Sequence, residues 1–212
     1  MQYTSAKPLF FPVSSQGTQN KQPSTDEVEP SEESRWLSSV ADGEKQAMGL
    51  LVGKWQEPLY RFFYRSLGNH ADAQDLTQKT FIRIYKAASR YRPSAKFSSW
   101  LFTIARNLLI DEVKRKQKAQ TIEFQEELTS VTSLSLDGKS VVDEWKEIFQ
   151  HVLQGTPEKQ RTALLLRVQQ EWSYLEIANL MEVSEQLVKT WIHRARQKLK
   201  DRLKILEKKG EL

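Results

Sequence analysis

Apolar residues recur at every third or fourth position along most of the chain from Trp36 onward, which is the spacing of one helix face. In the stretch 72–91, the positions predicted to form a buried face are Ala73, Leu76, Thr77, Thr80, Phe81, Ile84, Tyr85 and Ala88. Asp72 and Asp75 open this stretch and predict a helix start there, because carboxylates suit a helix N-terminus. An amphipathic helix is therefore predicted, with its charged and amide side chains on the opposite side.

A second helix is predicted after a break. Residues 92–99, "RPSAKFSS", interrupt the pattern with proline and serine. The pattern resumes at Trp100 and continues to the basic run "KRKQK" that ends at Lys118. The positions expected to face inward are Leu101, Ile104, Ala105, Leu108 and Leu109.

The last third of the chain predicts two closely connected helices. Thr156 and Pro157 indicate an earlier helix start, with the threonine as cap and the proline at the first helical position. Ser173 and Glu176 have the spacing of a capping box and open the short helix "YLEIANLM". After "EVS" (182–184), a longer helix runs from Glu185 past Leu203. Its predicted buried stripe is Val188, Ile192, Ala195, Leu199 and Leu203.

These patterns predict an all-α protein of two small helical domains joined by a flexible linker. Residues 1–33 are rich in Ser, Gln, Pro, Thr and Glu and are expected to be a disordered extension. The first domain is placed at 34–118 and the linker at 119–140. The second domain is placed at 141–206, with a helix from about 141 to 153, and a tail at 207–212.

Composition argues against an enzyme and for a polyanionic partner. The chain has no cysteine, and His70, His151 and His193 lie far apart, so we expect no metal site, no catalytic residues and no cofactor. No apolar run approaches the roughly 20 residues that a membrane-spanning helix needs. The net charge of +5 is concentrated in two blocks, with 16 basic and 7 acidic side chains in 34–118 and 12 and 8 in 156–212. Two cationic modules indicate contact with a nucleic acid at two places.

The two helices at 174–181 and 185–203 have the layout of a helix-turn-helix. In this motif the second helix enters the major groove of DNA and offers side chains near its start to base edges. Lys189 and Arg194 are suited to donate to guanine, Thr190 and His193 to make shorter contacts, and Arg196 to reach phosphates. The turn commonly contains glycine, but Glu182 stands there, so a strained or altered turn is expected.

The stretch "EWSYLEIANLMEVSEQLVKTWIHRARQKLKDRL" resembles the C-terminal domain of bacterial sigma factors of the extracytoplasmic-function (ECF) type, within the sigma-70 family. The upstream blocks "DAQDLTQKTFIRIYKAASRY" and "FSSWLFTIARNLLIDEVKRK" are similar to region 2 of the same family. The resemblance implies an alternative sigma factor that binds core RNA polymerase, recognises promoter elements near −35 and −10 and stabilises melted DNA.

The resemblance also implies site residues. On the polymerase-binding helix these are Asp75, Leu76, Gln78, Phe81 and Arg83, with Leu76 and Phe81 as structural support. For the −10 element they are Arg92, Lys96, Phe97, Trp100, Arg106, Asn107, Lys114 and Arg115. Tyr91, Phe97 and Trp100 beside positive charge suit single-stranded DNA. For the −35 element they are Ser184, Gln186, Lys189, Thr190, His193, Arg194 and Arg196.

The implied partners are the β′ clamp helices and β flap of core polymerase, promoter DNA and an anti-sigma factor. The expected location is the bacterial cytoplasm, with retention at the membrane through an anti-sigma factor as a further possibility and no direct membrane insertion. Two alternatives stay open from the sequence. One is a helix-turn-helix repressor or activator that binds duplex DNA without polymerase, and the other is a sigma mimic that sequesters an inhibitor. The role of the N-terminal extension stays open too.

Overall fold

The computed structural model describes residues 31–92, 96–123 and 149–209, and every element within these ranges is helical. The first elements are α1 (Glu32–Ala41), α2 (Lys45–Leu67), α3 (His70–Ala87), the 3-10 helix η1 (Ala88–Arg90) and α4 (Phe97–Glu123). Helical residues 149–154 are followed by α6 (Glu158–Gln169), α7 (Tyr174–Met181) and α8 (Glu185–Lys209). The predicted all-α class is confirmed.

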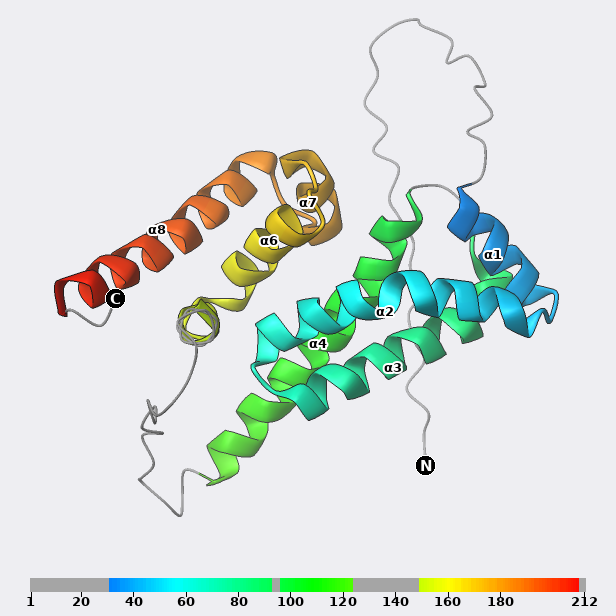
Figure 1. Cartoon of the computed structure of the whole chain (residues 1–212), viewed down its shortest axis with the longest axis horizontal. Coiled ribbons are helices and arrows are strands. Elements are labelled where there is room, and N and C mark those ends of the chain that lie inside the picture. Colours follow the sequence, from blue (N-terminus) through cyan, green and yellow to red (C-terminus); the bar gives the residue numbers. More distant parts are fainter. Residues whose placement is uncertain (1–30, 93–95, 124–148, 210–212) are drawn as a thin grey trace, which may run out of the picture.

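Helices α1 to α4 form one bundle, here called the N-terminal unit, in which α2 and α3 lie side by side (Figure 1). Its largest fully buried side chains are Leu37, Leu51, Leu59, Phe62, Phe63, Ile84, Leu101, Phe102 and Leu109. Burial of each such side chain contributes roughly 1.5–3 kcal/mol, so this core fixes how the helices are oriented.

The turn between α2 and α3 explains where α3 begins. Gly68 has a left-handed backbone (φ 72°), and its N–H donates to the Tyr64 carbonyl at 2.7 Å, which ends α2. Asn69 then caps α3, since its side-chain oxygen accepts from the Asp72 N–H at 3.0 Å. The prediction that Asp72 and Asp75 cap the start of this helix was therefore wrong. The cap is the side-chain oxygen of Asn69, and Asp72 already lies in the first turn of α3.

The predicted buried face of α3 is confirmed except at one position. Ala73, Leu76, Thr77, Thr80, Phe81, Ile84 and Ala88 are buried, as expected. Tyr85 is instead 61% exposed. It follows the fully buried Ile84 directly, and a step of one residue turns a side chain by about 100° around a helix.

Helix α4 is longer at both ends than predicted. It begins at Phe97, three residues before the expected Trp100, and the Lys96 carbonyl accepts from the Ser99 N–H at 2.9 Å. Phe97 is only 3% exposed, so burial of its ring holds the extra turn in place. At the other end α4 continues to Glu123, past the expected domain boundary at 118. The remainder of the expected linker and the predicted helix start at 141 lie outside the described residues.

The chain enters the N-terminal unit earlier than expected. Helix α1 begins at Glu32, inside the stretch to residue 33 that the composition assigned to the extension. The Ser31 hydroxyl caps it by accepting from the Ser34 N–H at 3.3 Å, and Glu32 and Glu33 place negative charge in the first turn. Residues 1–30 lie outside the described ranges.

Residues 149–209 form the C-terminal unit, with a core that includes Leu153, Leu165, Leu166, Ile177 and Val188. The predicted cap at Thr156 was wrong. The Thr156 hydroxyl donates back to the Val152 carbonyl at 2.8 Å, and Pro157 occupies the cap position of α6, one residue before the first helical position. The Pro157 carbonyl accepts from the N–H groups of Gln160 and Arg161, and these are the first backbone hydrogen bonds of α6.

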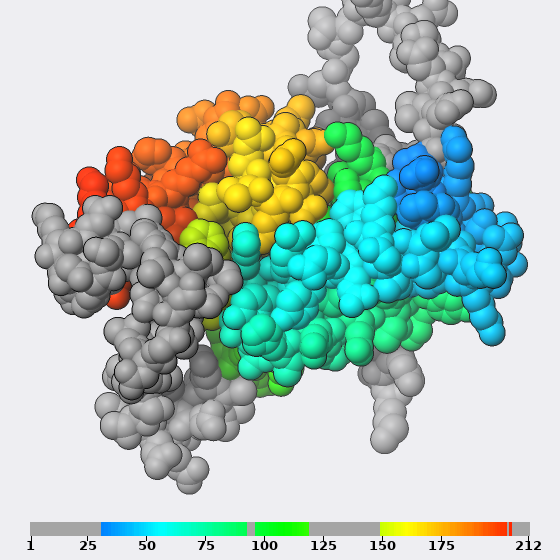
Figure 2. Space-filling view, viewed as in Figure 1, coloured from blue at the N-terminus to red at the C-terminus, as the bar shows by residue number. Residues whose placement is uncertain are grey.

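The C-terminal unit packs against the end of α2 and the start of α4, as the space-filling view also shows for α2 (Figure 2). The Phe102 ring of α4 meets the Trp172 ring at 5.6 Å between centroids. No helix in the described part of the chain is long and apolar enough to cross a bilayer.

Candidate functional site

The outer face of α3 presents the polar residues that the sequence singled out. Asp75, Gln78 and Arg83 are exposed, whereas Leu76 and Phe81 are 2% and 9% exposed. The first group can contact a partner, and the second holds the helix to its own bundle. Within this face the Asp75 carboxylate pairs with Lys79 at 2.6 Å.

The same face carries apolar residues that sequence reasoning missed. Ile82 and Tyr85 are 52% and 61% exposed and lie four and seven residues after Gln78. Next to Ile82, a groove of about 770 Å³ lies at the surface between α2 and α3 and is lined in part by Val52, Gln56, Tyr60, Gln74, Gln78 and Ile82. Exposed apolar side chains beside a groove are typical of a protein-binding surface. The sequence signal was the stripe 78–82–85, on the side opposite the fully buried Ile84.

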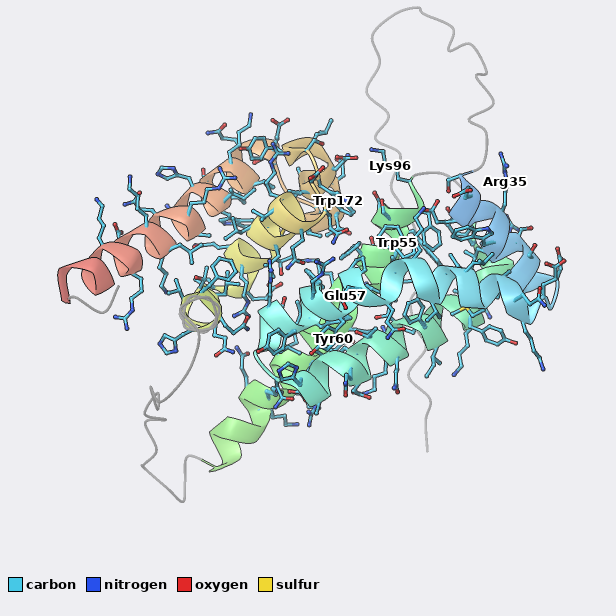
Figure 3. All side chains as sticks on the ribbon, viewed as in Figure 1. Arg35, Trp55, Glu57, Tyr60, Lys96 and Trp172 are labelled. Carbon is cyan, nitrogen blue, oxygen red and sulfur yellow. The ribbon has the colours of Figure 1, made fainter. Side chains whose placement is uncertain are left out.

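Tyr60, which lines the groove, belongs to an aromatic cluster at the turn between α2 and α3. The Tyr60 hydroxyl of α2 hydrogen-bonds to Nδ1 of His70 at the start of α3, and the centres of the Tyr64 and His70 rings stack 4.3 Å apart. Figure 3 shows Tyr60 on α2, near the start of α3. These contacts tie the two helices together at the turn.

The residues predicted for the −10 element gather around the start of α4. Tyr91, Phe97 and Trp100 form a cluster in which the Tyr91 and Trp100 rings are 4.8 Å apart and Phe97 and Trp100 are 5.8 Å apart. Trp100 is partly exposed and can offer a ring face. Phe97 is 3% exposed and packs on Trp55 as well, so it supports the cluster and offers no face to a base.

Further along α4, Trp100, Asn107 and Lys114 recur seven residues apart and share one side of the helix. Lys114 is exposed, and Arg106 and Asn107 are half-buried. The Arg115 guanidinium makes two hydrogen bonds to Glu112, at 2.6 and 2.9 Å, and these lower the pKa of that carboxyl. Arg115 remains largely exposed, so it can still approach a phosphate.

The two remaining cations of this group have partners within the chain. The Arg92 guanidinium donates to the carbonyls of Ser89 and Tyr91. The Lys96 ammonium lies 2.6 Å from the Glu176 carboxylate in α7. The structure therefore brings Lys96 beside the helix-turn-helix as well as beside Trp100.

The predicted helix-turn-helix is built as expected. Ser173 and Glu176 form the capping box, with the Ser173 N–H donating to the Glu176 carboxylate at 2.8 Å and the Glu176 N–H to the Ser173 hydroxyl at 3.1 Å. Glu182 ends α7 in the left-handed region (φ 56°), as its place in the turn predicted. Val188, Ile192 and Ala195 are each at most 1% exposed. The apolar stripe thus turns the opposite side of α8 toward solvent.

The solvent side of α8 carries the residues predicted for the −35 element. Ser184 lies just before the helix, and its hydroxyl accepts from the Leu187 N–H at 3.3 Å. The Lys189 ammonium lies 2.7 Å from Glu185 and 5.5 Å from the centre of the Tyr174 ring. The exposed members are Ser184, Gln186, Lys189, His193, Arg194 and Arg196, and Thr190 is half-buried.

Glu176 is the most strongly perturbed carboxyl in the described part of the chain. Its pKa falls from an ordinary 4.5 to about 2, chiefly because Lys96 hydrogen-bonds to the carboxylate and further because the Ser173 N–H and hydroxyl do so. The charged form is therefore favoured by two contacts at once. The contact with Ser173 caps the start of α7, and the contact with Lys96 joins α7 to the residue before α4.

Comparison with known proteins agrees with this division into two units. The family model "Sigma-70 region 2" matches residues 51–119, and "Sigma-70, region 4" matches 146–199. The ECF RNA polymerase sigma factor SigW of Bacillus subtilis is 31% identical over 179 residues, which cover 80% of this chain and 96% of SigW. The chain is an RNA polymerase sigma factor of the ECF type. Such proteins direct transcription initiation and are not enzymes, as predicted.

Other relatives and solved structures extend the likeness. The ECF sigma factor SigE of Mycolicibacterium smegmatis is 33% identical over 84% of this sigma factor and 72% of its own length. The structure of CnrH in complex with the cytosolic domain of CnrY has a TM-score of 0.61 at 22% identity, covering 82% of this chain and 97% of that one. The sigma factor RpoE of Bartonella quintana, in complex with the anti-sigma factor NepR, has a TM-score of 0.60 at 22% identity, covering 74% and 96%. Both structures share the fold of this sigma factor.

Proposed function

We propose that this sigma factor joins core RNA polymerase through the outer face of α3 and reads a promoter at two places, with α4 at the −10 element and α8 at the −35 element. The observation that carries the proposal is the arrangement of three separate solvent-facing surfaces on the two family units. The α3 surface combines polar and apolar side chains, and the α4 and α8 surfaces are basic.

The α3 face suits a protein partner, which we take to be the β′ clamp helices. Ile82 and Tyr85 supply apolar contact area, and Asp75, Gln78 and Arg83 surround them with groups that form hydrogen bonds and ion pairs. A protein interface commonly combines such an apolar centre with a polar rim. Leu76 and Phe81 would keep the helix in position from below.

The α4 surface suits melted DNA at the −10 element. Single-stranded DNA is bound by aromatic faces on which bases stack, beside cations that follow the backbone. Trp100 supplies the face, Asn107 the polar group for a base edge, and Lys96 and Lys114 the charge. Arg92, Arg106 and Arg115 add further positive charge around them.

The α8 surface suits duplex DNA at the −35 element. Arg194 and Lys189 can donate to guanine, Gln186, Thr190 and His193 can make shorter base contacts, and Ser184 and Arg196 can reach phosphates. Binding at two elements by two units would align polymerase and use binding free energy to hold the DNA open. Nucleotide addition would belong to polymerase.

Two further partners belong to the proposal. The sigma factor RpoE of Bartonella quintana was solved in complex with the anti-sigma factor NepR, which supports an anti-sigma factor as a partner of this chain as well. We also propose contact between the C-terminal unit and the β flap. Leu175 and Val168, which are 57% and 54% exposed, are the apolar groups available for it. Action in the cytoplasm, with retention at the membrane by an anchored anti-sigma factor, completes the proposal.

Run-off transcription with bacterial core polymerase on a library of genomic fragments tests this function. The expected result is a set of new transcripts, present only with both core and sigma factor, whose templates share elements near −10 and −35. The matched control is the Gln78→Ala, Ile82→Ser double variant, which should lose these transcripts while it remains helical. Failure of the wild type to bind or redirect core would overturn the proposal.

A further inference from the structure

One apolar side chain stands on the solvent side of α8, among the polar and basic residues proposed to bind DNA. Within residues 185–202, where the structure describes every side chain, Leu187 is the one large apolar residue that is exposed, at 39%. The core is filled without it, because Val188, Ile192 and Ala195 cover the buried side of the helix and are each at most 1% exposed. Single exposed leucines are common on proteins, so the position of Leu187 decides what this one does.

Leu187 shares one side of the helix with residues proposed to contact the −35 element. Thr190 and Arg194 follow it by three and seven positions, and residues at this spacing lie above one another on a helix. Arg194 is exposed and is proposed to donate to guanine. Helix α8 begins at Glu185, so Leu187 is its third residue. In a helix-turn-helix, the side chains near the start of the second helix are those that reach base edges in the major groove.

Hydrogen bonds in the first turn of α8 hold the backbone of Leu187 in place. The Leu187 N–H donates to the Ser184 carbonyl at 3.1 Å and to the Ser184 hydroxyl at 3.3 Å. The Thr190 hydroxyl donates to the Gln186 carbonyl at 3.0 Å. The leucine side chain therefore projects from a capped and ordered turn. It has no donor or acceptor of its own, so any base that it reads must be read through an apolar group.

Thymine is the base that an apolar side chain can distinguish in the major groove. Its C5 methyl group projects into that groove, and side chains that contact it do so through apolar atoms. The other bases present mainly hydrogen-bond donors and acceptors there, which a leucine would cover without offering a partner. A leucine at this position therefore favours a thymine in two ways. It gains contact with the methyl group, and it disfavours bases whose polar groups it would separate from water.

We propose that Leu187 is a specificity-determining residue that selects a thymine in the −35 element through contact with its C5 methyl group. The inference rests on the proposed function, because α8 reads bases only if it lies in the major groove of that element. Leu187 and Arg194 are about 10.5 Å apart along the helix axis, at about 1.5 Å per residue. This distance equals about three base pairs of B-form DNA, at about 3.4 Å each. The thymine is therefore expected within about three base pairs of the guanine that Arg194 reads.

Replacement of thymine by deoxyuridine tests the contact with the methyl group itself, because deoxyuridine pairs with adenine in the same way but lacks that group. The probe is a promoter found by run-off transcription, prepared with each −35 thymine of either strand replaced in turn. It is titrated with holoenzyme assembled from core and the full-length chain. At one thymine, the concentration for half-maximal transcription is expected to rise about fourfold, the effect of one lost apolar carbon. A −35 element without such a thymine, or one in which no replacement has an effect, would overturn the inference.

Substitutions at Leu187 assign the effect to this residue. Leu187→Ser removes the apolar contact and should transcribe the thymine and deoxyuridine templates equally, whereas Leu187→Met preserves it and should keep the difference. The matched control is Leu50→Ser, at a leucine of α2 that is 51% exposed, which should also keep the difference. A difference that persists in Leu187→Ser would overturn the inference, even if both templates are transcribed less well. Absence of promoter-specific transcription by the wild type with core would instead overturn the proposed function.

Discussion

At the scale of single residues, two glutamates of the helix-turn-helix do opposite things to stability. Glu176 stabilises the folded state, because hydrogen bonds from Lys96 and from the capping box both favour its charged form. Glu182 destabilises the folded state, because a residue with a Cβ there occupies a left-handed backbone conformation at φ 56°. The sequence predicted the capping box from its spacing and the unusual turn from the missing glycine, but it did not predict the contact between Lys96 and Glu176.

Substitution Glu182→Gly is expected to raise the free energy of unfolding by about 0.5–1 kcal/mol, because glycine adopts positive φ without steric cost. Urea denaturation followed by circular dichroism measures the change. Gln186→Gly, inside the first turn of α8, is the control and should lower stability by a similar amount. A less stable Glu182→Gly variant would show that the turn is not strained.

The pKa of Glu176 sets the sign of a pH effect. Because the folded value of about 2 lies below the ordinary 4.5, the charged carboxylate stabilises the folded state fully above about pH 4.5. This contribution is lost as the pH falls from 4.5 toward 2. The free energy of unfolding of the wild type should therefore fall more steeply over this window than that of Glu176→Gln. Parallel curves would contradict the assignment.

At the scale of elements, the exposed stripe of α3 separates binding from folding. The residues that hold α3 in the bundle lie around Ile84, and Gln78, Ile82 and Tyr85 lie on the outer side. Periodicity predicted the buried side well. It misplaced Tyr85, because an aromatic residue next to the apolar stripe looks like part of the core until the rotation of the helix is fixed by packing.

Substitution Ile82→Ser is expected to weaken binding to core polymerase about tenfold, since loss of apolar burial at an interface costs on the order of 1.4 kcal/mol. Fluorescence titration of labelled sigma factor with core, without DNA, gives the affinity. Lys204→Ser at the far end of α8 is the control and should bind as the wild type does. Unchanged affinity for Ile82→Ser would remove α3 from the core interface.

Helix α8 makes a separable prediction. Arg194→Ala should reduce transcription about tenfold on a promoter with an intact −35 element and relax the preference at one base pair there, because a bidentate guanine contact is worth about 1–3 kcal/mol. Arg196→Ala should instead weaken binding evenly across sequences and lower its salt dependence. Transcription from a set of single-base promoter variants distinguishes the two, and identical profiles would contradict the assigned roles.

At the scale of the whole molecule, the sequence predicted two helical units and their order but not how they meet. The Phe102 ring contacts the Trp172 ring about 70 residues further along the chain, and no pattern within one helix indicates such a contact. Helix boundaries were missed for a related reason. Helix α4 begins at Phe97, where burial of the ring adds a turn before the predicted start at Trp100. Helix α3 begins directly after its cap Asn69, before the predicted start at Asp72.

The central claim is that this sigma factor and core polymerase together open promoter DNA near −10. Permanganate footprinting tests it most directly, because permanganate oxidises thymines that are unstacked. We predict reactive thymines near −10 only when core and sigma factor are both present, and weaker reactivity with Trp100→Ala. Duplex DNA that stays unreactive with core, while the protein alone protects a site, would contradict the account and indicate a conventional helix-turn-helix regulator.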